Sequence, residues 1–397
     1  MIIRAAILSC SLLLTLPLFA RESTDVIVMR NGDRFTGTIK ALYGGVLYVG
    51  IPYIIETISI DWSKVGRIES NQLFIVKTED GSVYDGTLSS VEAAAGRPIE
   101  IRVTEPTETA AGTTAEPNRG SSGKTSEPNP GTTATPTEPN RGTAGKTVSL
   151  DSEKITGVTQ TSEKFFQRFT GGIGGGSIYS KGNESFQYSL SGLIAYPRER
   201  WGAQLGISSN LSANSGTNTS TRNQLTFQGV HLLPKVNYFA GGFDGFLQSA
   251  EQGISRQNTL GGGIGYYLKN NNHAKVSILG GIAWQSTSYT PTVSAIASQN
   301  LTTALIDANV KLFKFDKTNL DFNLILLPAL SDPGRIYTAV TAAYYIKITG
   351  NLSWNLTFYG NWDNKPPSNL PGSDYGTTSG LSWTFGSSMR TAPNSIQ

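Results

Sequence analysis

The chain has 397 residues, of which 38% are hydrophobic and 15% charged, and its net charge is +3. The apolar content excludes a chain that is disordered throughout, and the low share of charge is unusual for a water-soluble globule. So small a net charge, with no basic run beyond the N-terminus, argues against nucleic acid as a partner.

The first twenty residues carry one arginine, Arg4, then an apolar run, and end in the small residue Ala20. This pattern predicts a secretory signal peptide over residues 1–20, cleaved after Ala20. The apolar run is too short for a membrane anchor, and a lipoprotein cleavage site at Cys10 would leave too short an apolar region. Cys10 is the only cysteine, so we expect no disulfide and no thiol chemistry in the mature chain.

Residues 21–103 are expected to form a small periplasmic β domain. Within them, "VIVMRNGDRFTGTI" and "FIVKTEDGSVYDGTL" share an apolar run, an Asn/Asp-Gly turn signal and a Gly-Thr-aliphatic ending. The repeat indicates a duplicated, strongly bent hairpin and resembles the first half of an Sm/SH3-like small barrel. RNA binding would be the sharper interpretation, but a secreted domain meets no RNA, so a structural or protein-binding barrel is favoured.

Residues 104–146 carry almost no apolar side chains, and "AEPNRGSSGKT" returns 22 residues later as "TEPNRGTAGKT". Such a Pro/Gly/Thr-rich tract cannot bury enough surface to fold, which predicts a disordered insertion. Its Gly-Lys-Thr is no phosphate loop, because Asn118 stands where the motif needs glycine. Beyond the tract, residues 147–158 again resemble a strand and could pair with "IEIRV" (99–103), completing the small domain.

Residues 165–386 alternate strictly between apolar and small polar side chains, which is the β pattern. Most of the predicted strands are 11–15 residues long, which is enough to cross a membrane, because a tilted membrane strand needs about 9–11 residues. The pattern predicts twelve antiparallel strands, at roughly 165–179, 184–196, 201–212, 222–233, 238–249, 256–268, 275–289, 300–314, 319–330, 335–348, 352–362 and 375–386.

The expected connections are tight after even strands and mostly longer after odd strands, which is the pattern of an outer-membrane barrel. An even number of strands places both termini of the barrel domain on the short-turn, periplasmic side. The strands of a β-sandwich would also alternate between apolar and polar side chains. Long strands, an even number of strands and a polar face of small residues indicate instead that the apolar face contacts lipid. The fold class is therefore all-β, a twelve-stranded transmembrane barrel preceded by the small β domain and the disordered insertion.

Large aromatic residues fall near the predicted strand ends on the apolar face and indicate two interfacial girdles. One girdle lies toward the short turns and the other toward the long loops. The girdle residues are Trp201, Trp354 and, at the far end, Tyr289, Trp362 and Tyr375.

The last strand, "TTSGLSWTFG", also carries a polar–x–Gly–x–x–aromatic–x–aromatic pattern in Thr378, Gly380, Trp383 and Phe385. This resembles the signal that the outer-membrane barrel-assembly machinery recognises. The signal commonly ends a chain, whereas here residues 387–397 follow as a polar tail.

Six charged residues are predicted to face the lumen, and two of them, Lys311 and Asp321, flank one tight turn. They could form a selectivity constriction for a small polar solute or a salt-bridged plug that keeps a small barrel shut, and the plug is favoured. The predicted lumen cluster is Arg168, Asp244, Asp307, Lys311, Asp321 and Lys347.

An enzyme is not expected. The only histidines are His231, at the end of a strand, and His273, in a tight turn, and no Gly-x-Ser-x-Gly occurs, so an outer-membrane lipid hydrolase is a remote alternative. Two distant histidines and no mature cysteine likewise predict no metal site and no cofactor.

The stretches "GGGSIYSKGNESFQYSLSGLIAYPRERWGAQLGIS" and "RQNTLGGGIGYYL" resemble the family of salt-induced outer-membrane proteins, whose domain has no assigned function. The resemblance implies an outer-membrane location and no established chemistry. The expected partners are membrane lipid, lipopolysaccharide and the assembly machinery. Two roles stay open: a closed or narrow barrel acting as pore or envelope-stress component, or an anchored adaptor whose residues 25–103 bind a periplasmic protein or the cell wall.

Overall fold

The computed structural model describes residues 25–54, 57–91, 100–104, 147–160, 165, 169–180, 185–198, 200–214, 220–233, 237–291, 297–314, 318–367 and 370–385. The expected signal peptide, the tract 105–146 and the C-terminal tail lie outside these residues. No helix in the described part of the chain is long and apolar enough to cross a membrane.

The N-terminal domain is built around a ring of four strands: β1 (Asp25–Met29), β2 (Arg34–Tyr43), β9 (Ile155–Gln160) and β5 (Val65–Thr78). Strands β1 and β9 each pair with both β2 and β5, so the ring closes. The predicted small barrel is therefore confirmed. Ile27, Ile39 and Phe74, all fully buried, belong to the core inside it.

Further strands extend this ring on both sides. Strands β3 (Val46–Gly50) and β4 (Thr57–Asp61) continue from β2, while β6 (Val83–Val91), β7 (Glu100–Thr104) and β8 (Thr147–Asp151) continue from β5. Strand β7 pairs with β8 from Glu100↔Asp151 to Thr104↔Thr147, so the two sides of the insertion meet. Two short 3-10 helices, η1 (Trp62–Lys64) and η2 (Ser152–Lys154), precede β5 and β9.

The two repeated hairpins turn at Gly32 and Gly81, whose φ values of 92° and 82° lie in the left-handed region. Only glycine adopts this conformation without strain, which explains the Gly of both Asn/Asp-Gly signals.

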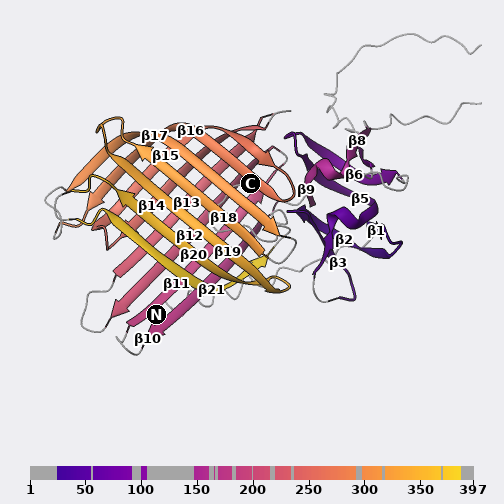
Figure 1. The fold of residues 1–397 in the computed structure, drawn as a ribbon, viewed down its shortest axis with the longest axis horizontal. Coiled ribbons are helices and arrows are strands. Elements are labelled where there is room, and N and C mark those ends of the chain that lie inside the picture. The colour runs from indigo at the N-terminus through magenta and orange to yellow at the C-terminus, as the bar shows by residue number, and fades with distance from the viewer. Residues whose placement is uncertain are drawn as a thin grey trace, which may run out of the picture.

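The second part of the chain forms a closed barrel of twelve antiparallel strands, as the sequence predicts (Figure 1). Each strand pairs with the next along the chain, and the last pairs with the first. The strands are β10 (Thr170–Ser180), β11 (Ser185–Pro197), β12 (Trp201–Asn214), β13 (Ser220–Leu232), β14 (Tyr238–Ser249), β15 (Ile254–Asn270), β16 (Ala274–Tyr289), β17 (Ser298–Lys314), β18 (Thr318–Pro328), β19 (Ile336–Thr349), β20 (Leu352–Asp363) and β21 (Ser373–Phe385).

The outside of this barrel is apolar, because alternate residues of each strand point outward and most of them are large and hydrophobic. Examples are Phe227, which is 53% exposed, and Ile282, which is 67% exposed. A water-soluble barrel would bury such side chains, so this surface is typical of a barrel that spans a membrane.

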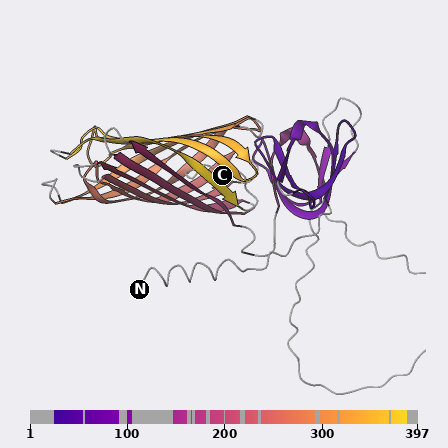
Figure 2. The ribbon, with the colours of Figure 1, turned by 90° about the horizontal axis from the view of Figure 1, so that it is seen from below.

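The two ends of the barrel differ. At one end the connections are short, down to two residues between β19 and β20, and at the other they reach nine residues between β20 and β21. The small domain lies at the short-turn end, where β10 begins and β21 ends (Figures 1 and 2). The barrel is broad in Figure 1 and narrow in Figure 2, so its cross-section is flattened.

Candidate functional site: the barrel lumen and its two ends

Four of the predicted lumen charges point into the barrel. Lys311 on β17 and Asp321 on β18 are directly paired across the ladder, and Lys311 Nζ lies 3.9 Å from a carboxylate oxygen of Asp321. Lys311 is only 3% exposed. Asp307 accepts a 2.6 Å hydrogen bond from Asn323, so these charges are held by neighbouring strands instead of projecting into an open channel.

The assignment of Asp244 to the lumen is wrong. In β14 the side chains of Phe239, Phe243 and Leu247 point inward, so Asp244 faces outward, where it is exposed. Its ladder partners Phe227 and Leu260 are themselves outward and exposed. Arg168, the sixth predicted residue, lies outside the described residues.

A second charge pair crosses the lumen toward the long-loop end, and sequence reasoning missed it. Arg222 on β13 donates to Asp374 on β21 at 2.7 Å, although these strands are not neighbours. Ser249 on β14 donates to the same carboxylate oxygen at 2.7 Å, and the Arg222 guanidinium lies 4.8 Å from the centre of the Tyr359 ring. Arg222 and Asp374 stand at the ends of their strands, and the predicted last strand began one residue too late to include Asp374.

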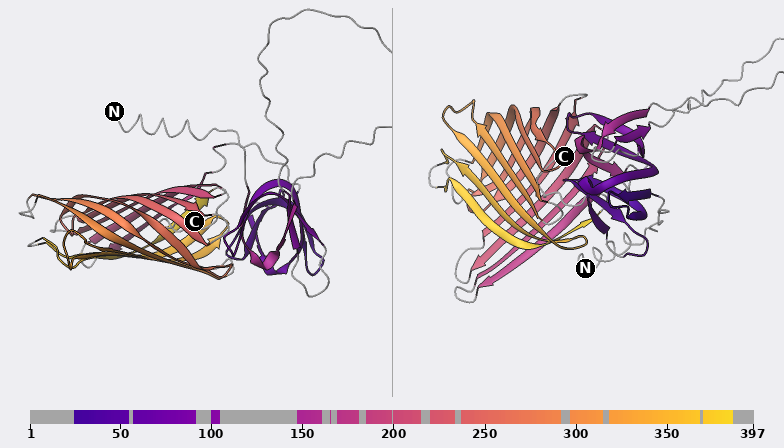
Figure 3. Two further views of the ribbon diagram at one scale, coloured as in Figure 1. Left: turned by 90° about the horizontal axis from the view of Figure 1, so that it is seen from above. Right: turned by 45° about the vertical axis from the view of Figure 1, so that its right-hand side comes forward.

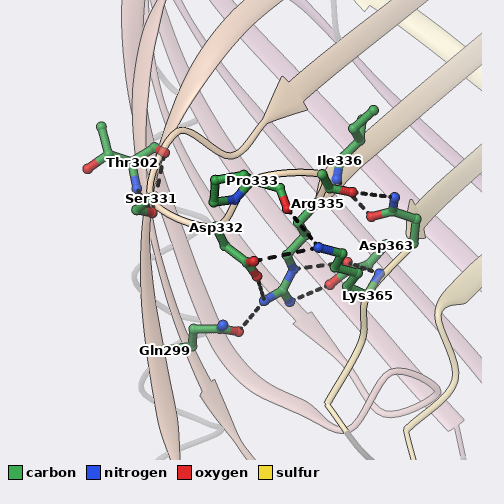
Figure 4. Close-up of polar contacts among 11 residues, drawn as sticks. Gln299, Thr302, Ser331, Asp332, Pro333, Arg335, Ile336, Asp363 and Lys365 are labelled. Carbon is green, nitrogen blue, oxygen red and sulfur yellow. Dashed lines mark hydrogen bonds and ion pairs between the residues drawn. The ribbon is translucent and has the colours of Figure 1, made fainter.

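A third charged cluster lies on the connection between β18 and β19 (Figure 4). Arg335 donates to Asp363 at 3.1 and 2.6 Å and to Gln299 at 2.6 Å. Lys365 donates to the carbonyl oxygen of Pro333 at 2.7 Å. These bonds hold the connection, β17 and the end of β20 together at the long-loop end.

The middle of the lumen is filled by apolar side chains, which corrects the expectation of an interior lined by small polar residues. The flattened cross-section brings inward-facing residues from opposite walls into one buried cluster. The core of this cluster, here called the lumen plug, is Val230, Phe239, Leu279, Ala283, Leu305, Leu327 and Tyr337.

The short-turn end is covered by the small domain. The rings of Tyr43 in β2 and Phe313 in the barrel meet edge to face, with centroids 4.8 Å apart. Lys275 Nζ lies 5.5 Å from the centre of the Tyr43 ring, and Lys347 donates to Ser59 Oγ at 3.0 Å. The domain therefore lies against the short-turn end of the barrel (Figure 3), and its contacts include two lysines of the barrel.

Asparagines of the short turns complete this contact through the backbone of the small domain. Asn237 donates to the carbonyl oxygen of Glu79 at 3.0 Å, and Asn272 donates to that of Ile155 at 2.9 Å. Such bonds specify an orientation, because each amide must meet one particular carbonyl group.

Four of the five predicted girdle residues point outward, namely Trp201, Trp354, Trp362 and Tyr375. Tyr289 does not, which corrects its assignment: it is 6% exposed and packs inside the barrel with Leu247 and Ile254. Exposed aromatic residues that the sequence analysis did not single out include Tyr238, Tyr266, Trp284 and Tyr344.

The residues of the predicted assembly signal all lie on β21. Trp383, which is 51% exposed, and Phe385 point outward with ring centroids 6.2 Å apart, while Thr378 and Gly380 face inward. Within the described ranges no group of three or more His, Cys, Asp or Glu side chains could hold a metal ion.

The solved structures that match this chain include three outer-membrane proteins at 9–11% identity. The translocator domain of the autotransporter NalP from Neisseria meningitidis is 10% identical, with a TM-score of 0.29 over 54% of this chain and 87% of that one. A bacterial polysaccharide outer-membrane secretin is 9% identical, with a TM-score of 0.29 over 55% and 98%. A porin is 11% identical, with a TM-score of 0.26 over 91% and 98%. With TM-scores this low, the fold assignment rests on the closed strand ladder.

No curated protein matches the sequence. One family model does, over residues 173–385, which include all but the first three residues of the barrel. The chain therefore belongs to the family described as "Protein of unknown function, DUF481".

Proposed function

We propose that the protein is a non-enzymatic outer-membrane barrel whose lumen is closed, with the small domain and both termini of the barrel domain on the periplasmic side. The apolar outside supports the membrane location. The observation that carries the closed state is the lumen plug, since water and ions do not cross a packed apolar layer. The ion pairs Lys311–Asp321 and Arg222–Asp374 lie toward the two ends of the same path and restrict it further.

Single-channel recording of the purified, refolded protein in planar bilayers tests this proposal. Wild type and Asp307→Ala should give no ohmic steps, because neither contains an open path. Leu305→Ala should give small steps, since it removes a fully buried plug residue, whereas its neighbour Ile306→Ala, which faces lipid, should not. Regular ohmic steps in the wild-type protein would contradict the closed-barrel proposal.

A second role, an anchored adaptor, is favoured by the way in which the small domain is held. Its contacts with the barrel use β2, β3, β4 and residues at the ends of β5 and β9, while Tyr53, which follows β3, is 81% exposed. A large exposed aromatic residue on a fixed domain suits a protein or cell-wall partner. Deleting residues 21–164 should abolish the cellular phenotype of the protein, and a phenotype that survives on the barrel alone rules the adaptor role out.

A further inference from the structure

The barrel wall has one weak seam. The ladder between β10 and β21 runs only from Gly171↔Phe385 to Gly175↔Leu381, although β10 continues to Ser180 and β21 begins at Ser373. Every other ladder of the barrel joins at least the nine pairs of β17 and β18. Beyond these five pairs, the facing edges of β10 and β21 are not paired with each other. Unpaired backbone N–H and C=O groups are energetically costly in the hydrocarbon of a membrane.

A cavity of about 320 Å³ lies where this ladder stops. Its walls include Gly176 and Ser177 of β10 and residues 373–379 of β21, together with inward-facing side chains of β11 to β13. A second cavity, of about 170 Å³, continues into the lumen and shares Ser189, Asn210 and Arg222 with the first. Leu327 and Tyr337 of the lumen plug form part of its wall, and Gln228, Phe243 and Asn323 separate it from a smaller cavity of about 70 Å³ deeper in the lumen.

The lining of this space is rich in neutral hydrogen-bonding groups. Hydroxyls and carboxamides predominate, the one buried charge pair is Arg222–Asp374, and Glu251 lies at the outer cavity. Inward-facing lining residues of this type are Gln187, Ser189, Ser191, Ser208, Asn210, Gln224, Thr226, Gln228, Asn355, Thr357 and Thr378.

Asn355 supplies an independent sign of a missing ligand. It lines the inner cavity and is 8% exposed, yet its side-chain oxygen has no hydrogen-bond partner among the described residues. A buried carboxamide oxygen without a partner is unfavourable, and a hydroxyl donor entering the cavity would satisfy it. The ring of Tyr359 also lines both cavities, with the Arg222 guanidinium 4.8 Å from its centre.

We propose that this cavity binds a neutral saccharide. Many donors and acceptors without net charge, a tyrosine ring and an unsatisfied carboxamide match a polyhydroxylated ligand better than an ion or an apolar molecule. The saccharide is either free, entering from the long-loop end, or the head group of a glycolipid whose acyl chains stay in the membrane while the head group passes through the seam. The binding of a saccharide goes beyond the closed-barrel function and does not depend on it.

Full-length protein in detergent tests both sources. Maltose, lactose and trehalose are titrated calorimetrically as free disaccharides. Digalactosyl diacylglycerol and phosphatidylcholine with the same acyl chains are compared by native mass spectrometry. We expect one-to-one binding of at least one disaccharide, or a preference for the glycolipid over phosphatidylcholine.

Variants locate the site. Asn355→Leu, which keeps the volume but removes the carboxamide, should weaken saccharide binding about fivefold. Asn300→Leu, at an exposed asparagine outside the cavity, should not change it. A disulfide between Ser177→Cys and Ser379→Cys should block the glycolipid but not a free disaccharide.

Two results overturn the proposal: no disaccharide binding together with equal retention of both lipids, or binding that Asn355→Leu leaves unchanged in a correctly folded barrel. Disaccharide binding without glycolipid preference identifies the free saccharide as the source. A preference for the glycolipid without disaccharide binding, lost when the disulfide is formed, identifies the glycolipid as the source. All of these readouts are independent of conductance, so a failure here and a failure of the closed-barrel proposal are distinguishable.

Discussion

Arg222 and Asp374 form the buried ion pair that joins opposite walls, and their side chains are 8% and 5% exposed. We expect Arg222→Met to lower the free energy of unfolding by roughly 3–5 kcal/mol, because the Asp374 carboxylate stays buried without its cation. Urea titration of the protein in lipid vesicles, followed by tryptophan fluorescence, measures the change. Arg222→Met combined with Asp374→Leu should recover most of the loss, and Arg256→Met, at an exposed arginine, should have little effect. If the single and the double variant lose the same free energy of unfolding, Arg222 and Asp374 do not act as a pair.

Asp244 is a carboxylate among outward-facing apolar residues. Replacing it with leucine should raise the free energy of unfolding in lipid by roughly 1–2 kcal/mol, because a charge facing hydrocarbon is removed. The matched change Asp307→Leu should have the opposite sign, since Asp307 faces inward and accepts a hydrogen bond from Asn323. The same urea titration checks both, and a stabilised Asp307→Leu would contradict this placement of the two residues.

The wrong assignment of Asp244 has a physical reason. In "GGFDGFLQ" both faces of the strand carry a phenylalanine, so alternation alone does not say which face meets lipid. The girdle assignment of Tyr289 was wrong for a related reason. An aromatic residue at a strand end can point into the lumen as well as toward the membrane interface. Where one face of a strand is mainly polar, as in β20, Trp354 and Trp362 were predicted correctly to point outward.

At the scale of elements, the contact between β5 and the barrel should depend on pH. Burial lowers the pKa of Lys77 on β5, which lies near enough to Lys275 on β16 for the two amines to repel each other when both are charged. In an undocked domain Lys77 stays protonated up to its ordinary pKa of 10.5. At pH values between the lowered pKa and 10.5, the undocked domain therefore binds more protons than the docked domain. Docking should therefore strengthen as the pH rises through this window.

Energy transfer between dyes on cysteines placed at Tyr53 and Asn300 would follow the docked fraction from pH 7 to pH 10. Lys77→Met should dock more tightly at pH 7 and lose the pH dependence, while Lys64→Met, at an exposed lysine of the same domain, should behave as wild type. A docked fraction that does not vary with pH in wild type contradicts the role of Lys77.

The elements themselves were largely predictable, because strand alternation and turn signals are local. The repeated hairpins, the pairing of residues 99–103 with the segment after the insertion and all twelve barrel strands followed from them. The strand that closes the small barrel was not identified, since β9 meets β2 more than one hundred residues away and no local pattern encodes that partner.

At the scale of the whole molecule, the protein should behave as an outer-membrane barrel in the cell. Purified outer membranes should contain it, and its gel mobility should shift on heating, because a closed barrel resists unfolding by detergent until it is boiled. Recovery of the whole protein in the soluble fraction, with no shift, would contradict the membrane location.

The lumen plug could not be predicted from the sequence. Phe239, Leu279 and Leu305 come from β14, β16 and β17, and they meet Leu327 and Tyr337 only because the barrel is flattened. Flattening depends on how the walls pack across the lumen, which no single strand records. The predicted choice between pore and plug could therefore not rest on charge alone.

The pairing of β7 with β8 has a practical consequence. Thr104 and Thr147 are opposite each other, with hydroxyl oxygens 3.2 Å apart, so the chain leaves and re-enters the small domain at one point. The 42 residues from 105 to 146 can thus be exchanged for a fluorescent protein or an affinity tag with every strand pair of the described residues kept, and a reporter placed there would register the state of the native, full-length barrel.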